Sequence, residues 1–140
     1  MFNKSTECAM AAMSLLAEVW GSDAERLTAR RIAEQRVLPG PFVAKVLTNL
    51  SQAGLVSGAP GPHGGYSLGR APDTITLRNI TECFERIGPM LTCPYEPSYC
   101  GETDTKCPLH DDLMALQEQK TAFLERTTLD VFCRSHPAGA

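Results

Sequence analysis

Glycines and prolines divide the first half of this 140-residue chain into short segments, and their spacing limits the fold more than any other feature. Apolar residues recur at helical intervals over residues 4–20, which predicts a first helix. Thr28 is the predicted N-cap of a second, shorter helix, which the two prolines and the glycine within residues 37–41 must end. A third helix is predicted over residues 41–53, with Gly54 as its C-cap.

A hairpin is predicted to follow these helices. Leu55-Val56 and Tyr66-Ser67-Leu68 are strand candidates, and residues 57–65 between them are rich in turn formers. Two short helices joined by a tight turn and followed by such a hairpin form a winged helix-turn-helix, whose third helix fits the DNA major groove. We therefore predict a mainly α fold with a winged helix-turn-helix DNA-binding domain at residues 1–78. Winged helices also serve as protein-interaction modules, so the pattern alone allows both uses.

The second half, residues 79–140, is predicted to hold a loop and a long helix. A short helix is expected from Thr76 or Leu77 to about Ile87, followed by an irregular loop at 88–108 and a final helix at 109–133. The apolar stripe of that final helix consists of Leu113, Leu116, Phe123, Leu124, Thr127, Val131 and Phe132. Nothing upstream clearly needs this stripe, so we expect a partner subunit to bury it, which makes residues 109–133 a dimerisation helix.

The charge is unevenly distributed along the chain. Residues 1–78 hold eight Lys and Arg against six Asp and Glu, and residues 79–140 hold five against ten. A basic front half suits DNA, although solvated surface charge explains the difference equally well. No apolar run approaches the ~20 residues that span a bilayer, and Met1 to Ala12 lacks the features of a signal peptide, so we expect a cytoplasmic protein without a membrane partner.

Several side chains are candidates for contact with DNA. The N-terminus of the second helix can offer backbone amides to a phosphate, and Arg30, Arg31, Arg36 and Lys45 add electrostatic attraction. The wing glycines let the backbone pass close to the sugar-phosphate chain. The predicted DNA-binding residues are Thr28, Arg30, Arg31, Pro41, Lys45, Asn49 and His63.

Five segments of the chain resemble the IscR/NsrR/RirA/CymR family of bacterial regulators. They are Leu27–Glu34, Phe42–Leu50, Ala53–Val56, Gly61–Leu68 and Ile75–Leu77. The wing motif Gly61-Pro62-His63-Gly64-Gly65-Tyr66 is the most specific of them, and the similarity extends over nearly the whole chain. It implies a homodimer in which the C-terminal helix joins two winged helices on a pseudo-palindromic operator in double-stranded DNA.

The chain departs from this family at three positions. Pro60 stands where many members carry an arginine for minor-groove contact, and Ala44 stands where the iron–sulfur biogenesis regulators carry a glutamate. His63 replaces a usual glycine and is a candidate for a different wing contact. The operator sequence therefore cannot be transferred from those relatives.

Three cysteines in the predicted loop are candidate metal ligands. Cys93, Cys100 and Cys107 are separated by six residues each, among prolines and glycines that keep them out of helices. Three thiolates and one further ligand suit either an iron–sulfur cluster or a structural zinc ion, although zinc sites usually contain a closer cysteine pair. Cys8, Cys83 and Cys133 fall on apolar helix faces and are predicted to be core thiols.

The family resemblance favours the cluster, since its cluster-binding members carry three cysteines in this loop. The longer spacing in this chain leaves a 2Fe–2S and a 4Fe–4S cluster as alternatives. The resemblance also implies two candidates for the fourth ligand. His110 matches the histidine ligand of the IscR type, and Glu7 matches the carboxylate that reaches the partner's cluster in nitric-oxide sensors.

These observations predict a dimeric DNA-binding repressor that senses nitric oxide, redox state or iron through an iron–sulfur cluster. The alternative is a zinc- or thiol-based winged-helix regulator without a cluster. No enzyme is expected, since the sequence has no nucleophile–base constellation and residues 61–65 do not fit a dinucleotide-binding fingerprint.

Overall fold

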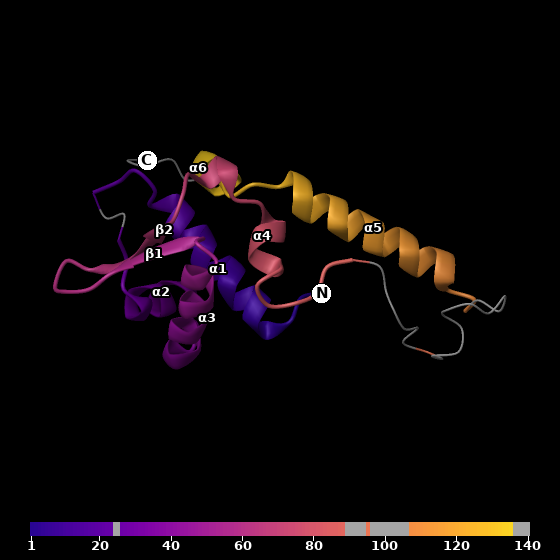
Figure 1. Cartoon of the computed structure of the whole chain (residues 1–140), viewed down its shortest axis with the longest axis horizontal. Coiled ribbons are helices and arrows are strands. Elements are labelled where there is room, and N and C mark those ends of the chain that lie inside the picture. The colour runs from indigo at the N-terminus through magenta and orange to yellow at the C-terminus, as the bar shows by residue number, and fades with distance from the viewer. Residues whose placement is uncertain (24–25, 89–94, 96–106, 136–140) are drawn as a thin grey trace.

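The computed structural model describes residues 1–23, 26–88, 95 and 107–135. Figure 1 shows the wing hairpin at one end of the long axis and a projecting helix, α5, at the other. The elements in chain order are α1 (Lys4–Glu18), α2 (Ala29–Arg36), α3 (Gly40–Gln52), β1 (Val56–Ala59), β2 (Gly65–Leu68), the 3₁₀ turn η1 (Pro72–Thr74), α4 (Leu77–Thr81), α5 (His110–Arg126) and α6 (Asp130–Ser135).

The first three helices pack around one apolar core and confirm the predicted helical segments. The Asn3 side chain caps α1 by accepting a hydrogen bond from the Thr6 N–H at 2.8 Å. Thr28 caps α2 as predicted, because its hydroxyl accepts from the Arg31 N–H at 3.1 Å. Gly54 follows α3 with φ +76°, a conformation that favours glycine and ends the helix. The fully buried side chains of this core include Met13, Leu16, Ile32, Val43, Leu47 and Leu50.

The turn from α2 to α3 passes through an unusual residue. Val37 has φ 54° and ψ 57°, and it is the only non-glycine residue with positive φ in the described part of the chain. Its N–H and that of Leu38 both donate to the Ala33 carbonyl, which ends α2. The left-handed conformation is costly for a β-branched side chain, so the tight turn is formed at the expense of local strain.

The predicted wing hairpin is confirmed, with one change in its bounds. β1 and β2 pair in antiparallel register from Val56–Leu68 to Ala59–Gly65, so β1 runs further into the segment expected to be loop. A separate bridge joins Tyr66 of the wing to Leu27, through N–H to O hydrogen bonds of 2.9 and 2.7 Å. This bridge fixes the wing against the residues that precede α2.

α4 is shorter than expected. Thr76 and Asn79 form a capping box at its start, in agreement with the predicted start at Thr76 or Leu77. The helix ends at Thr81, and the next residues form tighter turns, with Phe84 and Glu85 both donating their N–H groups to the Thr81 carbonyl. The apolar residues that suggested a helix as far as Ile87 lie in these turns, where they still pack against the core.

The prediction of one continuous helix at 109–133 was wrong. Thr127 is extended between α5 and α6, and its carbonyl accepts from the Leu77 N–H at 2.9 Å. Leu129 donates its own N–H to the Ile75 carbonyl at 3.0 Å, and its side chain is fully buried. These backbone hydrogen bonds and the burial of Leu129 interrupt the helix and place α6 against α1. The core therefore contains residues from both sides of the domain boundary predicted at residue 78.

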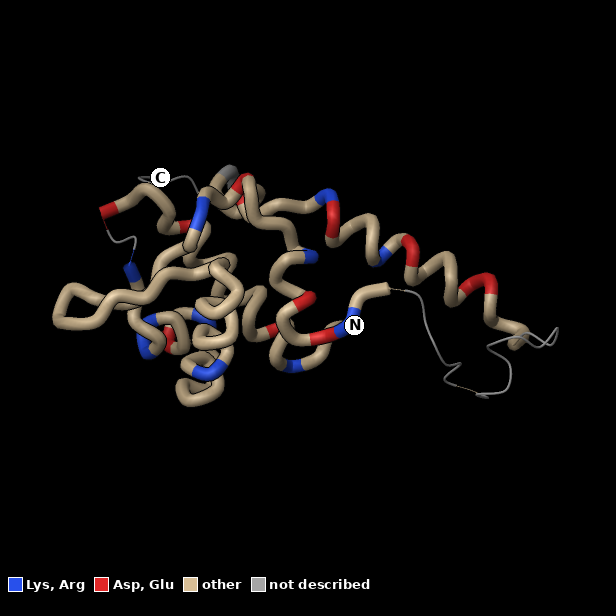
Figure 2. The backbone as a smooth tube through the Cα atoms, viewed as in Figure 1, with Lys and Arg blue, Asp and Glu red and all other residues tan. Residues whose placement is uncertain are grey.

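Charge is distributed differently over the two ends of the molecule (Figure 2). Basic residues gather around α2 and α3, whereas α5 carries both signs and begins with Asp111 and Asp112. Within the described residues, no helix is long and apolar enough to span a membrane.

Candidate nucleic-acid interface and metal site

One face of α3 is exposed and carries three of the predicted DNA-binding residues. Pro41 and Lys45 are exposed and Asn49 is half-buried, at intervals of four residues that place them on the same side of the helix. The opposite face is fully packed, with Val43, Val46, Leu47 and Leu50 in the core. The outer face therefore needs no further intramolecular partner to be stable.

The N-terminus of α2 presents the remaining predicted helix residues. Arg31 is exposed beside the Thr28 cap. Arg30 is also exposed, and its guanidinium donates to the Glu34 carboxylate one turn further on, at 3.1 Å. This surface ion pair contributes little to stability, so Arg30 can exchange Glu34 for another anion at small cost.

Arg36 does not belong to this surface. Its guanidinium donates to the Ala11 carbonyl, the Ser14 hydroxyl and the Glu18 carboxylate, at 3.2, 3.1 and 2.9 Å. All three acceptors lie on α1, and the ion pair with Glu18 is about three-quarters buried. The expectation of phosphate attraction from Arg36 was wrong, because the side chain joins α2 to α1.

A groove lies between the wing and the start of α2 and brings together residues far apart in the sequence. Its lining consists of Ser22, Asp23, Arg26, Thr28, Arg31, Pro62, His63 and Gly64. His63 thus lies beside Thr28 and Arg31, as a joint DNA-binding surface requires. The sequence analysis missed Arg26 as a DNA-binding candidate. Its position two residues before the Thr28 helix cap could have indicated it.

The wing glycines are required by close backbone contacts. A Cβ at Gly64 would lie 2.1 Å from the Ala59 carbonyl oxygen, and one at Gly65 would lie 2.8 Å from the Leu27 carbonyl. Gly65 also has φ +131°, which disfavours other residues. The wing motif is therefore the sequence that permits a tight hairpin tip lying against residue 27.

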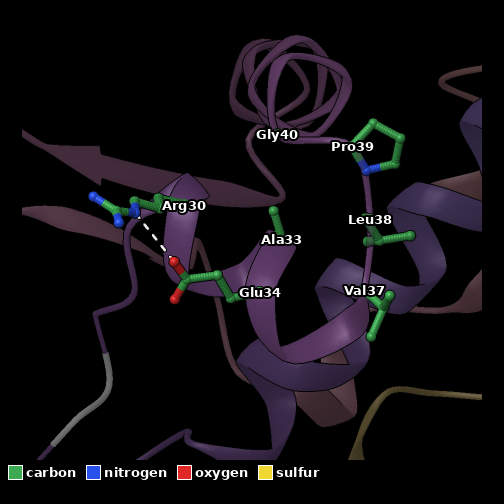
Figure 3. Close-up of a pocket in the computed structure, with 7 residues that line it drawn as sticks. All are labelled: Arg30, Ala33, Glu34, Val37, Leu38, Pro39 and Gly40. Carbon is green, nitrogen blue, oxygen red and sulfur yellow. Dashed lines mark hydrogen bonds and ion pairs between the residues drawn. The ribbon is translucent and has the colours of Figure 1, made fainter.

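A second hollow lies at the turn between α2 and α3 (Figure 3). Its walls are Arg30, Ala33, Glu34, Val37, Leu38, Pro39 and Gly40, with the Arg30–Glu34 ion pair across one side. Val37 is 89% exposed, so an apolar side chain projects from the turn directly before α3. Sequence reasoning missed this residue, because a valine gives no local signal for a left-handed turn.

The predicted metal site is only partly described. Cys107 is 6% exposed, its thiol accepts from the Leu109 N–H at 3.4 Å, and its carbonyl accepts from the His110 N–H at 2.9 Å. Cys107 and His110 therefore lie together at the start of α5, while Glu7 is exposed in the first turn of α1. Cys93 and Cys100 lie outside the described residues, and the described part contains no group of three metal-ligating side chains.

The other three cysteines lie against the core, as expected. Cys8 is buried, and this burial raises the pKa of its thiol. Burial, followed by the charge of Glu82, also raises the pKa of Cys83, whose thiol donates to the Asn79 carbonyl at 3.4 Å. Cys133 donates to the Ala17 carbonyl at 3.0 Å. The raised pKa values of Cys8 and Cys83 favour the protonated thiol, which is a poor metal ligand.

A polar network joins α1, α5 and the segment that leads toward the cysteine loop. Glu85 accepts hydrogen bonds from the Thr6 hydroxyl at 2.6 Å and the Asn3 N–H at 2.9 Å, and it pairs with Lys120 of α5 at 3.6 Å. Burial alone would raise the pKa of Glu85, but these donors and the charge of Lys120 hold it below its usual value. We call Asn3, Thr6, Glu85 and Lys120 the Glu85 network.

α5 leaves part of its apolar stripe uncovered. Leu116 is 55% and Phe123 41% exposed, and with Leu113, Lys120 and Met1 they line a shallow hollow of about 450 Å³. Leu124 was expected at the same partner-facing seam, but it is fully buried in the chain's own core. Consecutive residues of a helix project about 100° apart, so Leu124 can face the chain's own core while its neighbour Phe123 stays exposed.

Comparisons with known proteins agree with this architecture. An Aquifex aeolicus protein named as a candidate HTH-type transcriptional regulator is 34% identical over 131 residues, which cover 92% of this chain and 88% of that protein. The solved structure of CymR, the global cysteine regulator of B. subtilis, superposes with a TM-score of 0.76 at 24% identity, covering 96% of this chain and 97% of that one. IscR from T. potens gives a TM-score of 0.73 at 22% identity, covering 100% and 91%.

These two structures share the fold, which confirms the mainly helical winged helix-turn-helix prediction. The relatives are named as transcriptional regulators, in agreement with the expectation that the chain is not an enzyme. Residues 2–135 match the family model of Rrf2, described as iron-dependent transcriptional regulators, and the chain therefore belongs to the Rrf2 family of transcriptional regulators.

Proposed function

We propose that the chain acts as a homodimeric DNA-binding repressor whose affinity for its operator depends on an iron–sulfur cluster. The observation that carries the DNA-binding part is the outer face of α3, where Pro41, Lys45 and Asn49 lie opposite a fully packed side. The helix presents this face without exposing its core side, as a recognition helix in the major groove requires.

Residues beside α3 extend this surface. Thr28, Arg30 and Arg31 lie at the start of α2, and the bridge between Leu27 and Tyr66 holds the wing and His63 next to them. In this proposal the arginines and Lys45 neutralise phosphates and set the register, while the exposed side chains of α3 read base edges. Two such surfaces in a dimer suit a pseudo-palindromic operator.

The dimer is proposed to form through α5. Leu116 and Phe123 are large apolar side chains left exposed in the single chain, and their hollow is mostly apolar. Exposed apolar surface of this kind on a long helix is typical of a face that another subunit covers. The exposed Met1 at its edge allows the N-terminus to take part in the same contact.

Cys93, Cys100 and Cys107 are proposed to supply three thiolates to the cluster, with His110 as the fourth ligand and Glu7 of a partner subunit as the alternative. The donor set fits an iron–sulfur cluster, and Cys107 and His110 already lie together, joined by a backbone hydrogen bond. When bound, the cluster supplies a centre that reacts with nitric oxide or oxygen or responds to iron supply.

The Glu85 network connects the segment that precedes the cysteine loop to α1 and α5. Glu85 lies before the cysteine loop and bonds both the cap region of α1 and Lys120 of the proposed dimer helix. A change in the loop that displaces Glu85 therefore alters how α5 sits against α1. In a dimer, this changes the placement of the two recognition helices on DNA.

Anaerobic purification followed by visible spectroscopy and iron and sulfide analysis tests the sensor. A brown protein is expected, and Cys100→Ser should abolish its visible absorbance, because two thiolates and one weak ligand are too few. Cys83→Ala is the matched control, since that thiol bonds a backbone carbonyl and should leave the spectrum intact. His110→Ala should retain a cluster with altered stability, unless Glu7→Ala has that effect instead.

Two results would contradict the cluster. A colourless protein containing zinc would identify the zinc-based alternative, and full iron content in Cys100→Ser would remove that residue from the site. Measuring DNA affinity with and without the cluster then tests whether the site controls binding.

A further inference from the structure

The groove between the wing and α2 combines the positive charge of two arginines with an imidazole side chain. Arg26 and Arg31 line it from the α2 side, and His63 lines it from the wing tip. An imidazole is the side chain whose ordinary charge change falls between about pH 5 and pH 8. We propose that His63 and these two arginines form a phosphate-binding cleft, and that protonation of His63 tightens DNA binding. This inference rests on the proposed DNA-binding function.

The backbone fixes His63 in this position. Tyr66 and Leu27 exchange two hydrogen bonds of 2.9 and 2.7 Å, so the wing cannot swing away from the start of α2 without breaking them. The tip itself is closed by the Gly64 N–H, which donates to the Gly61 carbonyl at 2.9 Å. His63 is therefore held within a tight turn rather than at the end of a free loop.

The charges facing His63 favour an anion. Among the described residues that line the groove, one is acidic, Asp23, against Arg26, Arg31 and the imidazole. The described structure shows no ion pair from Asp23 to any of the three. Thr28 adds the start of α2, where backbone N–H groups and the helix dipole also favour negative charge.

A phosphate is the anion that this surface meets on DNA. The groove is open, its lining is mainly polar, and it takes part of its wall from the wing, so a backbone phosphate can enter beside the wing. Each added positive charge on the protein strengthens such contacts and increases their dependence on salt. A protonated imidazole at His63 adds one such charge, so protonation there should tighten DNA binding.

Fluorescence anisotropy with a labelled duplex selected from a random library tests the inference. The holoprotein should bind roughly 3- to 10-fold more tightly at about pH 6 than at about pH 8, since one charged contact is gained. His63→Gln retains a hydrogen-bonding group but does not titrate, so most of this difference should disappear. His63→Lys keeps the charge throughout and should bind tightly at both pH values.

The control separates His63 from the protein's other titrating groups, because only the difference between wild type and His63→Gln is used. Replacing single phosphates of the duplex by uncharged methylphosphonates should remove the His63-dependent response at one position, or a few, in each half-site. Equal pH responses in wild type and His63→Gln would overturn the inference while leaving DNA binding intact. A response that survives every methylphosphonate would show a base contact instead, and no binding to any duplex would refute the proposed function itself.

Discussion

Replacing Val37 by glycine should stabilise the protein, although the substitution removes an apolar side chain. Val37 holds φ 54° and ψ 57°, which costs an L-residue about 1–2 kcal/mol, and it is 89% exposed, so little burial is lost. Glycine adopts this conformation freely but gains about 0.5–1 kcal/mol of chain entropy in the unfolded state. The middle values of these two ranges give a net gain of about 0.75 kcal/mol.

Thermal unfolding at fixed protein concentration measures this effect. For a domain of this size, the gain corresponds to a rise in Tm of roughly 1–4 °C. Ala44→Gly is the matched control, because Ala44 is also exposed but lies within α3, where glycine should cost about 1 kcal/mol. An unchanged or lower Tm for Val37→Gly, together with the expected loss in Ala44→Gly, would refute the strain argument.

Three further substitutions test other parts of the structure. Lys45→Ala should weaken operator binding. If Lys45 neutralises one phosphate, the slope of log affinity against log salt concentration should fall by about one unit. An unchanged slope would show that Lys45 lies outside the interface. Leu116→Asp should yield monomers in light scattering, because burying an unpaired charge in the α5 seam is costly, whereas a stable dimer would place the seam elsewhere. Glu85→Gln should cost about 1 kcal/mol at neutral pH, since it removes a charged acceptor and the partner of Lys120. The folded-state pKa of Glu85 lies below its usual value. The wild type should therefore have the larger free energy of unfolding above the usual carboxyl range, and lose this difference from Glu85→Gln as the pH falls through the lowered pKa. Urea denaturation at a series of pH values measures the difference.

Features with local causes could be predicted from the sequence. The Thr28 cap, the end of α3 at Gly54 and the wing tip depend on neighbouring residues, and each follows from side-chain chemistry or from the freedom of glycine. The exposed face of α3 was also predictable, since the helical period separates Lys45 from Val46 and Leu47.

Features that depend on distant segments were not predictable. The break at Thr127 arises from hydrogen bonds to Ile75 and Leu77, about 50 positions earlier in the chain, and no residue near Thr127 signals it. Arg36 was assigned to DNA because a guanidinium on a surface helix gives no indication that α1 supplies three acceptors. Arg26 and His63 become neighbours only through the Leu27–Tyr66 bridge.

A β-bridge pairs Thr76 with Thr128, so the residues between them begin and end at the same place in the fold, like an inserted segment. The backbone leaves the winged-helix core through α4 and re-enters it directly beside that exit, where Leu124 and Leu129 complete the packing. The residues between α4 and α5 and most of α5 therefore lie between two backbone segments that are joined to each other in the core. Each doubling of loop length costs in general only about 0.6 kcal/mol, so a change in the spacing of the cysteines should cost the winged helix little stability. It follows that a shortened chain, with the outer part of this inserted segment replaced by a brief glycine-rich link, is a route to an isolated monomeric DNA-binding unit.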